Sequence, residues 1–321
     1  MARDRDVIVG SSAAVSAAAL FGMLGPLARF GADVGVGGAA FTAWRAILGI
    51  AFLAILIGVR GRATSSVAAL RGLSPRGRLA LGLAAVMGIA LNVSIFTAFG
   101  LVPIALALML FYTYPAGVAV VDVALGRERA TASRVLALGL SLTGVVLVLV
   151  GGTDTAAGAP ISVLGVALGL AAAASQVVFV TVSRSGYTSV PADAATLVIL
   201  AASAVGASVI AALVGQGGQV VAPLTSLAPW PYLLLAGVAA AGISSLLFLT
   251  AIRTIGGTRT GILMLFEPVV GVILAAVLLG EPLGPVQLLG GLLVLAGALV
   301  LQLGAAPELS PVTEPGAGPV V

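Results

Sequence analysis

The sequence contains no cysteine and no histidine, and all of its 15 basic residues are arginine. It can therefore form no disulfide, no thiolate nucleophile, no imidazole proton switch and no metal site built on those two residue types. Charged residues make up only 8% of the chain and aromatic residues 5%, whereas a soluble domain carries roughly 25% charged residues. Such a chain cannot coat a water-facing surface with charge, which excludes a soluble globular fold.

The sequence is instead rich in hydrophobic residues, which make up 60% of its 321 residues, and its mean hydropathy is +1.22. A membrane-spanning helix needs about 20 apolar residues, so the chain is predicted to be an all-α polytopic membrane protein with ten transmembrane helices. The expected spans are residues 7–30, 39–59, 78–100, 103–125, 133–151, 162–183, 193–214, 231–253, 258–280 and 286–304. The tail, 305–321, carries proline, glycine and glutamate without periodicity, and we predict that it is a disordered cytoplasmic segment.

The distribution of arginine predicts the orientation of these spans. If the N-terminus is cytoplasmic, only Arg29 and Arg45 lie toward the outside, and segments 151–160 and 215–230 carry no basic residue. The positive-inside rule then places both termini in the cytoplasm and the protein in the cytoplasmic (inner) cell membrane. The arginines are spread over many loops and form no basic face, so no nucleic-acid partner is predicted. The expected partners are the lipid bilayer and a small-molecule substrate.

The second half of the chain repeats features of the first at a nearly constant spacing. The matched pairs are Pro115 and Pro268, Glu128 and Glu281, Gly144 and Gly297, Gly151 and Gly304, and, at a slightly larger spacing, Gly10 and Gly165 and Arg29 and Arg184. Two repeats, 7–151 and 162–304, would hold five spans each. Because that number is odd, the second repeat enters the membrane with opposite polarity, which is the inverted-topology arrangement of many transporters.

An acid and two prolines lie where the spans should be most apolar. Pro115 and Pro268 fall about 15 Å along their helices, near the bilayer midplane, and each frees a backbone carbonyl that needs a partner in hydrocarbon. We interpret them as hinges or cavity-lining residues, with plain structural kinks as the alternative. Glu267 should face protein or water. It is a candidate for proton coupling or for binding a substrate amine, and the alternative is a protonated carboxyl that only joins two helices.

The other candidates are polar side chains at similar depth, and each has a purely structural role as the alternative. Tyr114 is the repeat mate of Glu267 and lies beside Tyr112; both could line a cavity or merely pack between helices. Arg45 could bind a carboxylate or extend toward the interface beside Trp44. The candidate binding or coupling residues are Glu267, Tyr114, Pro115, Pro268, Tyr112, Asn92, Gln176, Ser175, Ser245 and Arg45. Glu128 and Glu281 are interpreted as parts of turns between spans, and a GxxxG pair, Gly165 and Gly169, leaves a homodimer open.

Motifs for other chemistry are missing from the sequence. There is no GxxxxGK[ST] nucleotide-binding loop, no HExxH motif and no serine–histidine pair. We therefore expect no enzymatic activity, no cofactor and no metal. The leading hypothesis is a secondary transporter that works by alternating access, with proton antiport through Glu267 as a sub-hypothesis. The alternative is a non-transport membrane protein, either a scaffold or a lipid-acting enzyme.

Two related motifs carry a family resemblance. The second copy of the motif reads Leu265–Phe266–Glu267–Pro268 and then Leu279–Gly280–Glu281–Pro282–Leu283. The first copy, earlier in the chain, reads Tyr114–Pro115 and then Gly126–Arg127–Glu128. This double pattern resembles the paired EamA-type repeats of the drug/metabolite transporter superfamily, over about residues 7–304. The resemblance implies ten spans, cytoplasmic termini, a central cavity and export of amino acids or other small metabolites. The first copy departs from the pattern at Tyr114 and Arg127, and the family's breadth leaves the substrate open.

Overall fold

The structure is a computed structural model that describes residues 2–61, 63–126, 131–152, 162–183, 186–255, 260, 263–281 and 283–304. The predicted tail and the residues Arg127, Glu128, Arg184 and Arg259 lie outside the described residues. Within the described ranges the chain is helical and contains no strand. The helices of the first half are α1 (Ala2–Gly22), α2 (Leu24–Asp33), α3 (Gly38–Val59), α4 (Ala63–Arg71), α5 (Pro75–Ala98), α6 (Ile104–Phe111), α7 (Tyr114–Ala124) and α8 (Ala132–Gly152). Those of the second half are α9 (Val163–Ser183), α10 (Ala192–Leu213), α11 (Gly217–Thr225), α12 (Trp230–Leu234), the π-helix η1 (Leu235–Ile243), α13 (Ser244–Ile255), α15 (Phe266–Leu279) and α16 (Pro285–Gly304).

The helices account for ten passes through a membrane. In the described part of the chain, seven helical stretches are long and apolar enough to cross it. Shorter apolar helices cover Val135–Val148, Phe266–Leu279 and Pro285–Val300, which are the expected fifth, ninth and tenth spans. The predicted all-α polytopic membrane fold is confirmed, and the chain is a multi-pass membrane protein.

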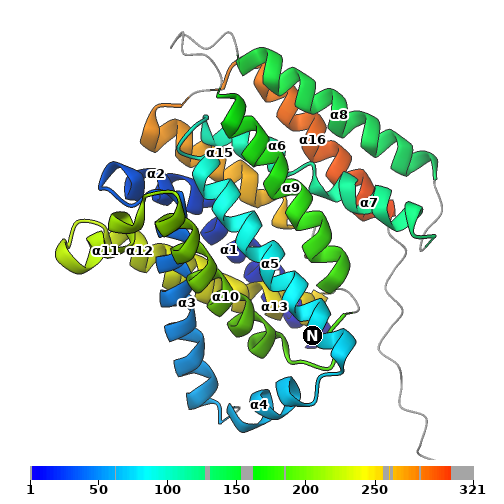
Figure 1. Cartoon of the computed structure of the whole chain (residues 1–321). Coiled ribbons are helices and arrows are strands. Elements are labelled where there is room, and N and C mark those ends of the chain that lie inside the picture. The colour runs from blue at the N-terminus through cyan, green and yellow to red at the C-terminus, as the bar shows by residue number, and fades with distance from the viewer. Residues whose placement is uncertain are drawn as a thin grey trace, which may run out of the picture.

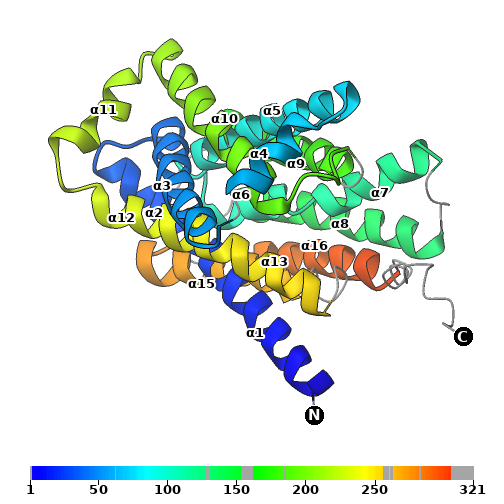
Figure 2. The same ribbon diagram turned by 90° about the horizontal axis from the view of Figure 1, so that it is seen from below.

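The packing of the helices follows the inverted repeat. In Figures 1 and 2, α8 and α16, the last spans of the two halves, lie side by side. The second spans, α3 and α10, pack together, as do α6 and α15 from the fourth and ninth spans. The contact between α5 and α9 has its counterpart in the contact between α13 and α1. These matched contacts are what a pseudo-twofold axis through the middle of the bundle requires.

The fourth and ninth spans are interrupted near that axis. Helix α6 ends at Phe111 and α7 begins at Tyr114, so that Pro115 lies in a first turn, where its missing N–H costs nothing. In the ninth span Leu265 forms a turn before α15 starts at Phe266, with Pro268 in its first turn. The interruption that the two prolines predict is present in both spans. Each break creates the N-terminus of a half-helix in the interior of the protein.

Three helical elements were not expected from the sequence. The segments 63–71 and 217–225 were assigned to loops but form the short helices α4 and α11. Part of the eighth span winds as the π-helix η1, where Gly237 packs on Leu48 of α3. Short helices between spans and a π-helical segment within a span have no distinct periodicity in an apolar sequence. The hydrophobic pattern therefore does not predict them.

The contact between α8 and α16 depends on two glycines. A Cβ added at Gly144 would lie 2.5 Å from the carbonyl oxygen of Gly290, and one at Gly290 would lie 2.6 Å from that of Gly144. Both obstacles are backbone, which cannot rotate away. We expect Gly144→Ala to force the helices apart and lower the free energy of unfolding by about 1–3 kcal/mol. Thermal unfolding of the purified protein in detergent measures this.

The control for that substitution lies on the same helix. Gly139 is exposed, and an added Cβ would meet nothing within 4 Å. Gly139→Ala should therefore leave stability unchanged or raise it by about 0.5–1 kcal/mol through helix propensity. Equal effects of the two substitutions would contradict the close packing of α8 on α16.

Candidate functional site: a central cavity between the two halves

A cavity of about 300 Å³ lies between the two repeats, next to the interrupted helices. Its walls come from α1, α2, α3, α5, α6, α7, α9, α13 and α15 together with the turn before α15. Most of the lining is apolar or aromatic, including Phe96, Phe111 and Phe248. The polar side chains among the lining residues are Arg45, Asn92, Tyr112, Tyr114, Gln176 and Glu267. This volume is at the small end of ligand cavities in proteins, so it suits a small metabolite.

One wall carries a positive charge that is held in place but not neutralised. Arg45 of α3 donates a hydrogen bond from Nη1 to Oδ1 of Asn92, at 2.9 Å. The amide of Asn92 is itself fixed, because Nδ2 donates to the carbonyl of Gly88 at 2.8 Å. The guanidinium also lies over the ring of Phe96, 5.4 Å from its centroid, an arrangement that favours a cation. Among the described residues Arg45 forms no ion pair within 4.0 Å, so the guanidinium remains able to bind an anion.

The other charged group of the cavity is Glu267, at the N-terminus of the half-helix α15. The helix dipole favours a negative charge at this position. The Tyr112 hydroxyl lies close to the Glu267 carboxyl, and both side chains line the cavity. Helix α1 approaches closely here, since a Cβ added at Gly22 would lie 2.8 Å from the carbonyl oxygen of Glu267. A glycine at position 22 thus lets two spans meet where the acid is placed.

Two buried polar atoms of the cavity residues have no hydrogen-bond partner among the described residues. They are Nε of Arg45 and Oε1 of Gln176, one a donor and the other an acceptor. Buried polar groups in proteins are almost always paired, and an unpaired one costs about 1–3 kcal/mol. Both residues line the cavity. A polar ligand or water in the cavity is therefore the partner that this arrangement lacks.

Comparison with known proteins agrees with the repeat and with the fold. The profile of the EamA-like transporter family matches the chain twice, over residues 8–150 and 163–303. The chain belongs to the EamA-like transporter family. A protein whose crystal structure has been solved is 19% identical in sequence to this chain. The two structures superpose with a TM-score of 0.58, over 93% of this chain and 98% of the other. At that identity it supports the fold alone. No curated protein matches the chain.

EamA-like proteins are membrane transporters of the drug/metabolite transporter superfamily. The structure brings six of the residues proposed from the sequence to the wall of the cavity: Glu267, Tyr112, Tyr114, Arg45, Asn92 and Gln176. Four others are not among the lining residues: Pro115, Pro268, Ser175 and Ser245. The prolines mark the starts of the half-helices, and the Ser245 hydroxyl donates to the carbonyl of Ala241 in its own helical segment, at 2.5 Å.

Two contacts of this EamA-like chain differ from the simplest interpretation of its sequence. The repeat pairs Glu267 with Tyr114, yet Tyr112 lies close to Glu267 as well. The break between α6 and α7 turns the side chain at position 112 toward the ninth span, and repeat spacing alone cannot show this. Trp44 is buried against protein, with 9% of its surface exposed, and its Nε1 donates to the carbonyl of Val220 in α11 at 2.8 Å.

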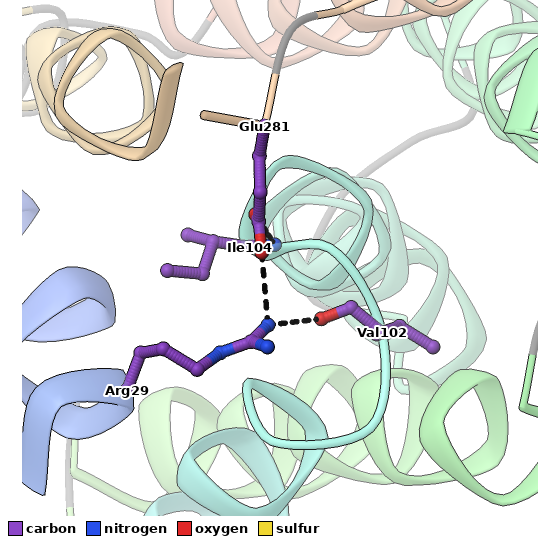
Figure 3. Close-up of polar contacts among 4 residues, drawn as sticks. All are labelled: Arg29, Val102, Ile104 and Glu281. Atoms are coloured by element: carbon purple, nitrogen blue, oxygen red, sulfur yellow. Dashed lines mark hydrogen bonds and ion pairs between the residues drawn. The ribbon is translucent and has the colours of Figure 1, made fainter. Parts of the chain in front are cut away.

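Glu281 was interpreted as part of a turn, and the structure gives it a second role. It does follow the C-terminus of α15, where Gly280 adopts φ +65°, a left-handed conformation that favours glycine. Its carboxylate, however, reaches across to the first half of the chain. Glu281 pairs with Arg29 at 3.0 Å and accepts from the amide of Ile104 at 2.9 Å (Figure 3). The sequence spacing relates Arg29 to Arg184 and gives no sign of this partner.

Proposed function

We propose that this protein is a secondary transporter that exports a small zwitterionic metabolite, such as an amino acid, by alternating access through the central cavity. The observation that carries the proposal is the pair of opposite charges in one small cavity. Arg45 is fixed by Asn92 but forms no ion pair among the described residues, and Glu267 lies on another span of the same cavity. An α-amino acid carries the complementary charges a few bonds apart.

The chemistry of each side chain suits one end of such a substrate. A guanidinium offers a planar set of donors that matches a carboxylate, and the free Nε of Arg45 is one of them. Glu267 can accept an ammonium group, to which the adjacent aromatic rings would also be attracted. The apolar lining around them, with Phe111 and Phe248 among its members, suits an aliphatic or aromatic side chain.

Proton antiport through Glu267 completes the proposal. One carboxylate can hold either the substrate ammonium or a proton, and this competition couples the two movements in opposite directions. The carboxyl that would exchange them lies in the first turn of α15, close to the Tyr112 hydroxyl. In an antiporter the direction of net transport is set by the gradients of the proton and the substrate. A cytoplasmic substrate and an inward proton gradient then drive export.

Counterflow in proteoliposomes tests the transport activity. Purified protein is reconstituted, the vesicles are loaded with a mixture of unlabelled L-amino acids, and the same mixture at trace radiolabelled concentration is added outside. The proposal predicts transient accumulation of label that protein-free liposomes do not show. Absence of accumulation for every amino acid would contradict an amino-acid substrate. A rate that is unaffected both by a pH gradient and by Glu267→Gln would contradict proton antiport.

A further inference from the structure

Four groups meet at one end of the bundle, where the first half of the chain contacts the second. They are the Arg29 guanidinium, the Glu281 carboxylate, the Val102 carbonyl and the Ile104 amide (Figure 3). Nη2 of Arg29 donates both to Oε1 of Glu281, at 3.0 Å, and to the carbonyl of Val102, at 3.1 Å. The other carboxylate oxygen of Glu281 accepts from the backbone of Ile104, at 2.9 Å. Each oxygen of Glu281 therefore binds a different element.

The contact with Ile104 supplies a helix cap that the local sequence lacks. Helix α6 follows Pro103, which has no side-chain group to accept from the first N–H groups of the helix. Glu281, 177 residues away in sequence, provides that acceptor. A carboxylate at a helix N-terminus also gains from the helix dipole. Removal of Glu281 from this position would leave a 0% exposed residue, Ile104, with an unpaired amide.

The main hydrophobic core adjoins these four groups, since its members include Ala28, Val102 and Ile104. Arg29 and Glu281 are themselves only 26% and 19% exposed at their side chains. By contrast, the clusters toward the opposite end are small, with Leu73, Leu81 and Val190 in one and a few alanines in the other. The end near Glu281 is therefore the more extensively packed of the two.

We infer that these four groups form a latch that holds this end of the cavity closed and that breaks each time this end opens. The inference rests on the proposed alternating-access function. The helices that the latch joins, α2, α6 and α15, also line the cavity through Leu24, Leu108 and Glu267. An opening wide enough for a substrate must move α15 away from α2 and α6. That movement separates Arg29 from Glu281 and uncaps α6 in one step, which sets the balance between closed and open states.

The absence of cysteine from the sequence allows a direct test by thiol labelling. Leu91→Cys introduces a single thiol at a half-buried residue that lines the cavity. A membrane-impermeant maleimide is added to each face in turn, with intact cells for one face and inverted vesicles for the other. Adding Glu281→Gln should speed labelling from the latch face about fivefold, the effect expected when a partly buried ion pair is lost.

A matched control is available on α2. Asp33 is an exposed acid at the same end of the bundle, and Asp33→Asn removes the same charge without touching the four groups. It should leave the labelling rate as it is in Leu91→Cys alone. Equal labelling rates from the latch face for Leu91→Cys with and without Glu281→Gln, including failure to detect labelling in either, would overturn the inference.

A cross-link separates the latch from the transport function. Arg29→Cys and Glu281→Cys are combined and joined by a short, cleavable bifunctional thiol reagent, because these two side chains span more than a disulfide does. Cross-linking should abolish L-leucine counterflow, and cleavage should restore it. Counterflow that survives cross-linking would overturn the latch while leaving the transport function intact. If neither the wild-type protein nor the uncross-linked variant transports any amino acid, the proposed function fails, and the labelling experiment still decides the latch.

Discussion

Glu267→Gln is expected to reduce L-leucine counterflow by about a hundredfold and to abolish any response of the remaining flux to a pH gradient. The amide keeps the size and the polarity of the side chain, so the cavity should retain its shape. It can hold neither a proton nor a charge-paired ammonium, and loss of a charge-assisted contact in a closed site costs several kcal/mol. Initial rates at several imposed gradients, in matched proteoliposomes, measure both effects.

Three results distinguish the roles of this acid. If the substituted protein loses only the gradient response but keeps counterflow, Glu267 couples protons without binding the amine. If it loses counterflow and now favours substrates without an amine, Glu267 binds the amine. Wild-type rates with a wild-type gradient response would show that the carboxyl serves only helix packing, the alternative that the sequence left open. Tyr112→Phe provides the positional control, because it removes the hydroxyl that lies close to the carboxyl and should give a smaller loss.

Arg45→Gln is expected to raise the KM for L-leucine by about a hundredfold, because the substrate carboxylate loses a charged, multi-donor partner. The maximal rate should fall less, since the substitution leaves Glu267 and the four groups of the latch in place. Arg45→Lys should lie between the two, because an ammonium keeps the charge but not the planar set of donors. Concentration-dependent uptake in proteoliposomes gives KM and the maximal rate separately.

Asn92→Ala tests whether the Arg45 guanidinium must be positioned. The charge would remain, but the 2.9 Å contact that fixes Nη1 would be lost, so we expect a rise in KM of about tenfold, well below that of Arg45→Gln. An unchanged KM for Arg45→Gln would contradict carboxylate binding and would reduce Arg45 to a partner of Asn92 and Phe96.

The broad architecture was predictable from the sequence because it depends on composition and spacing. Apolar runs of about 20 residues dictate membrane-spanning helices, and Pro115 and Pro268, at matching positions in the repeat, mark where two of them break. Glu267 could be singled out because an acid in a membrane-spanning helix is energetically costly and usually has a function. These features are local in sequence, or periodic, and need no knowledge of tertiary contacts.

The contacts that define the cavity and its closed end were not predictable in the same way. Arg45 could have faced the interface or the interior, and only the packing of α3 against α5 places it beside Asn92. Glu281 looked like a turn residue because its partners are 177 and 252 residues away. Ser175 and Ser245 are polar and were expected at the same depth as Gln176. The rotation of their helices keeps both serines off the cavity wall. In an apolar chain with little amphipathic pattern, helix rotation leaves almost no trace in the sequence.

The central claim is that one cavity binds the two charged ends of a zwitterion through Arg45 and Glu267. Three molecules with the same isobutyl group test it most directly in competition with labelled L-leucine counterflow: unlabelled L-leucine, isopentylamine, which lacks the carboxylate, and 4-methylpentanoate, which lacks the amine. We predict that L-leucine competes at least about thirtyfold better than either analogue, since each analogue leaves one buried charge unpaired. Equal competition by all three would contradict the account, because it would show that the cavity selects for the hydrocarbon and not for the charges.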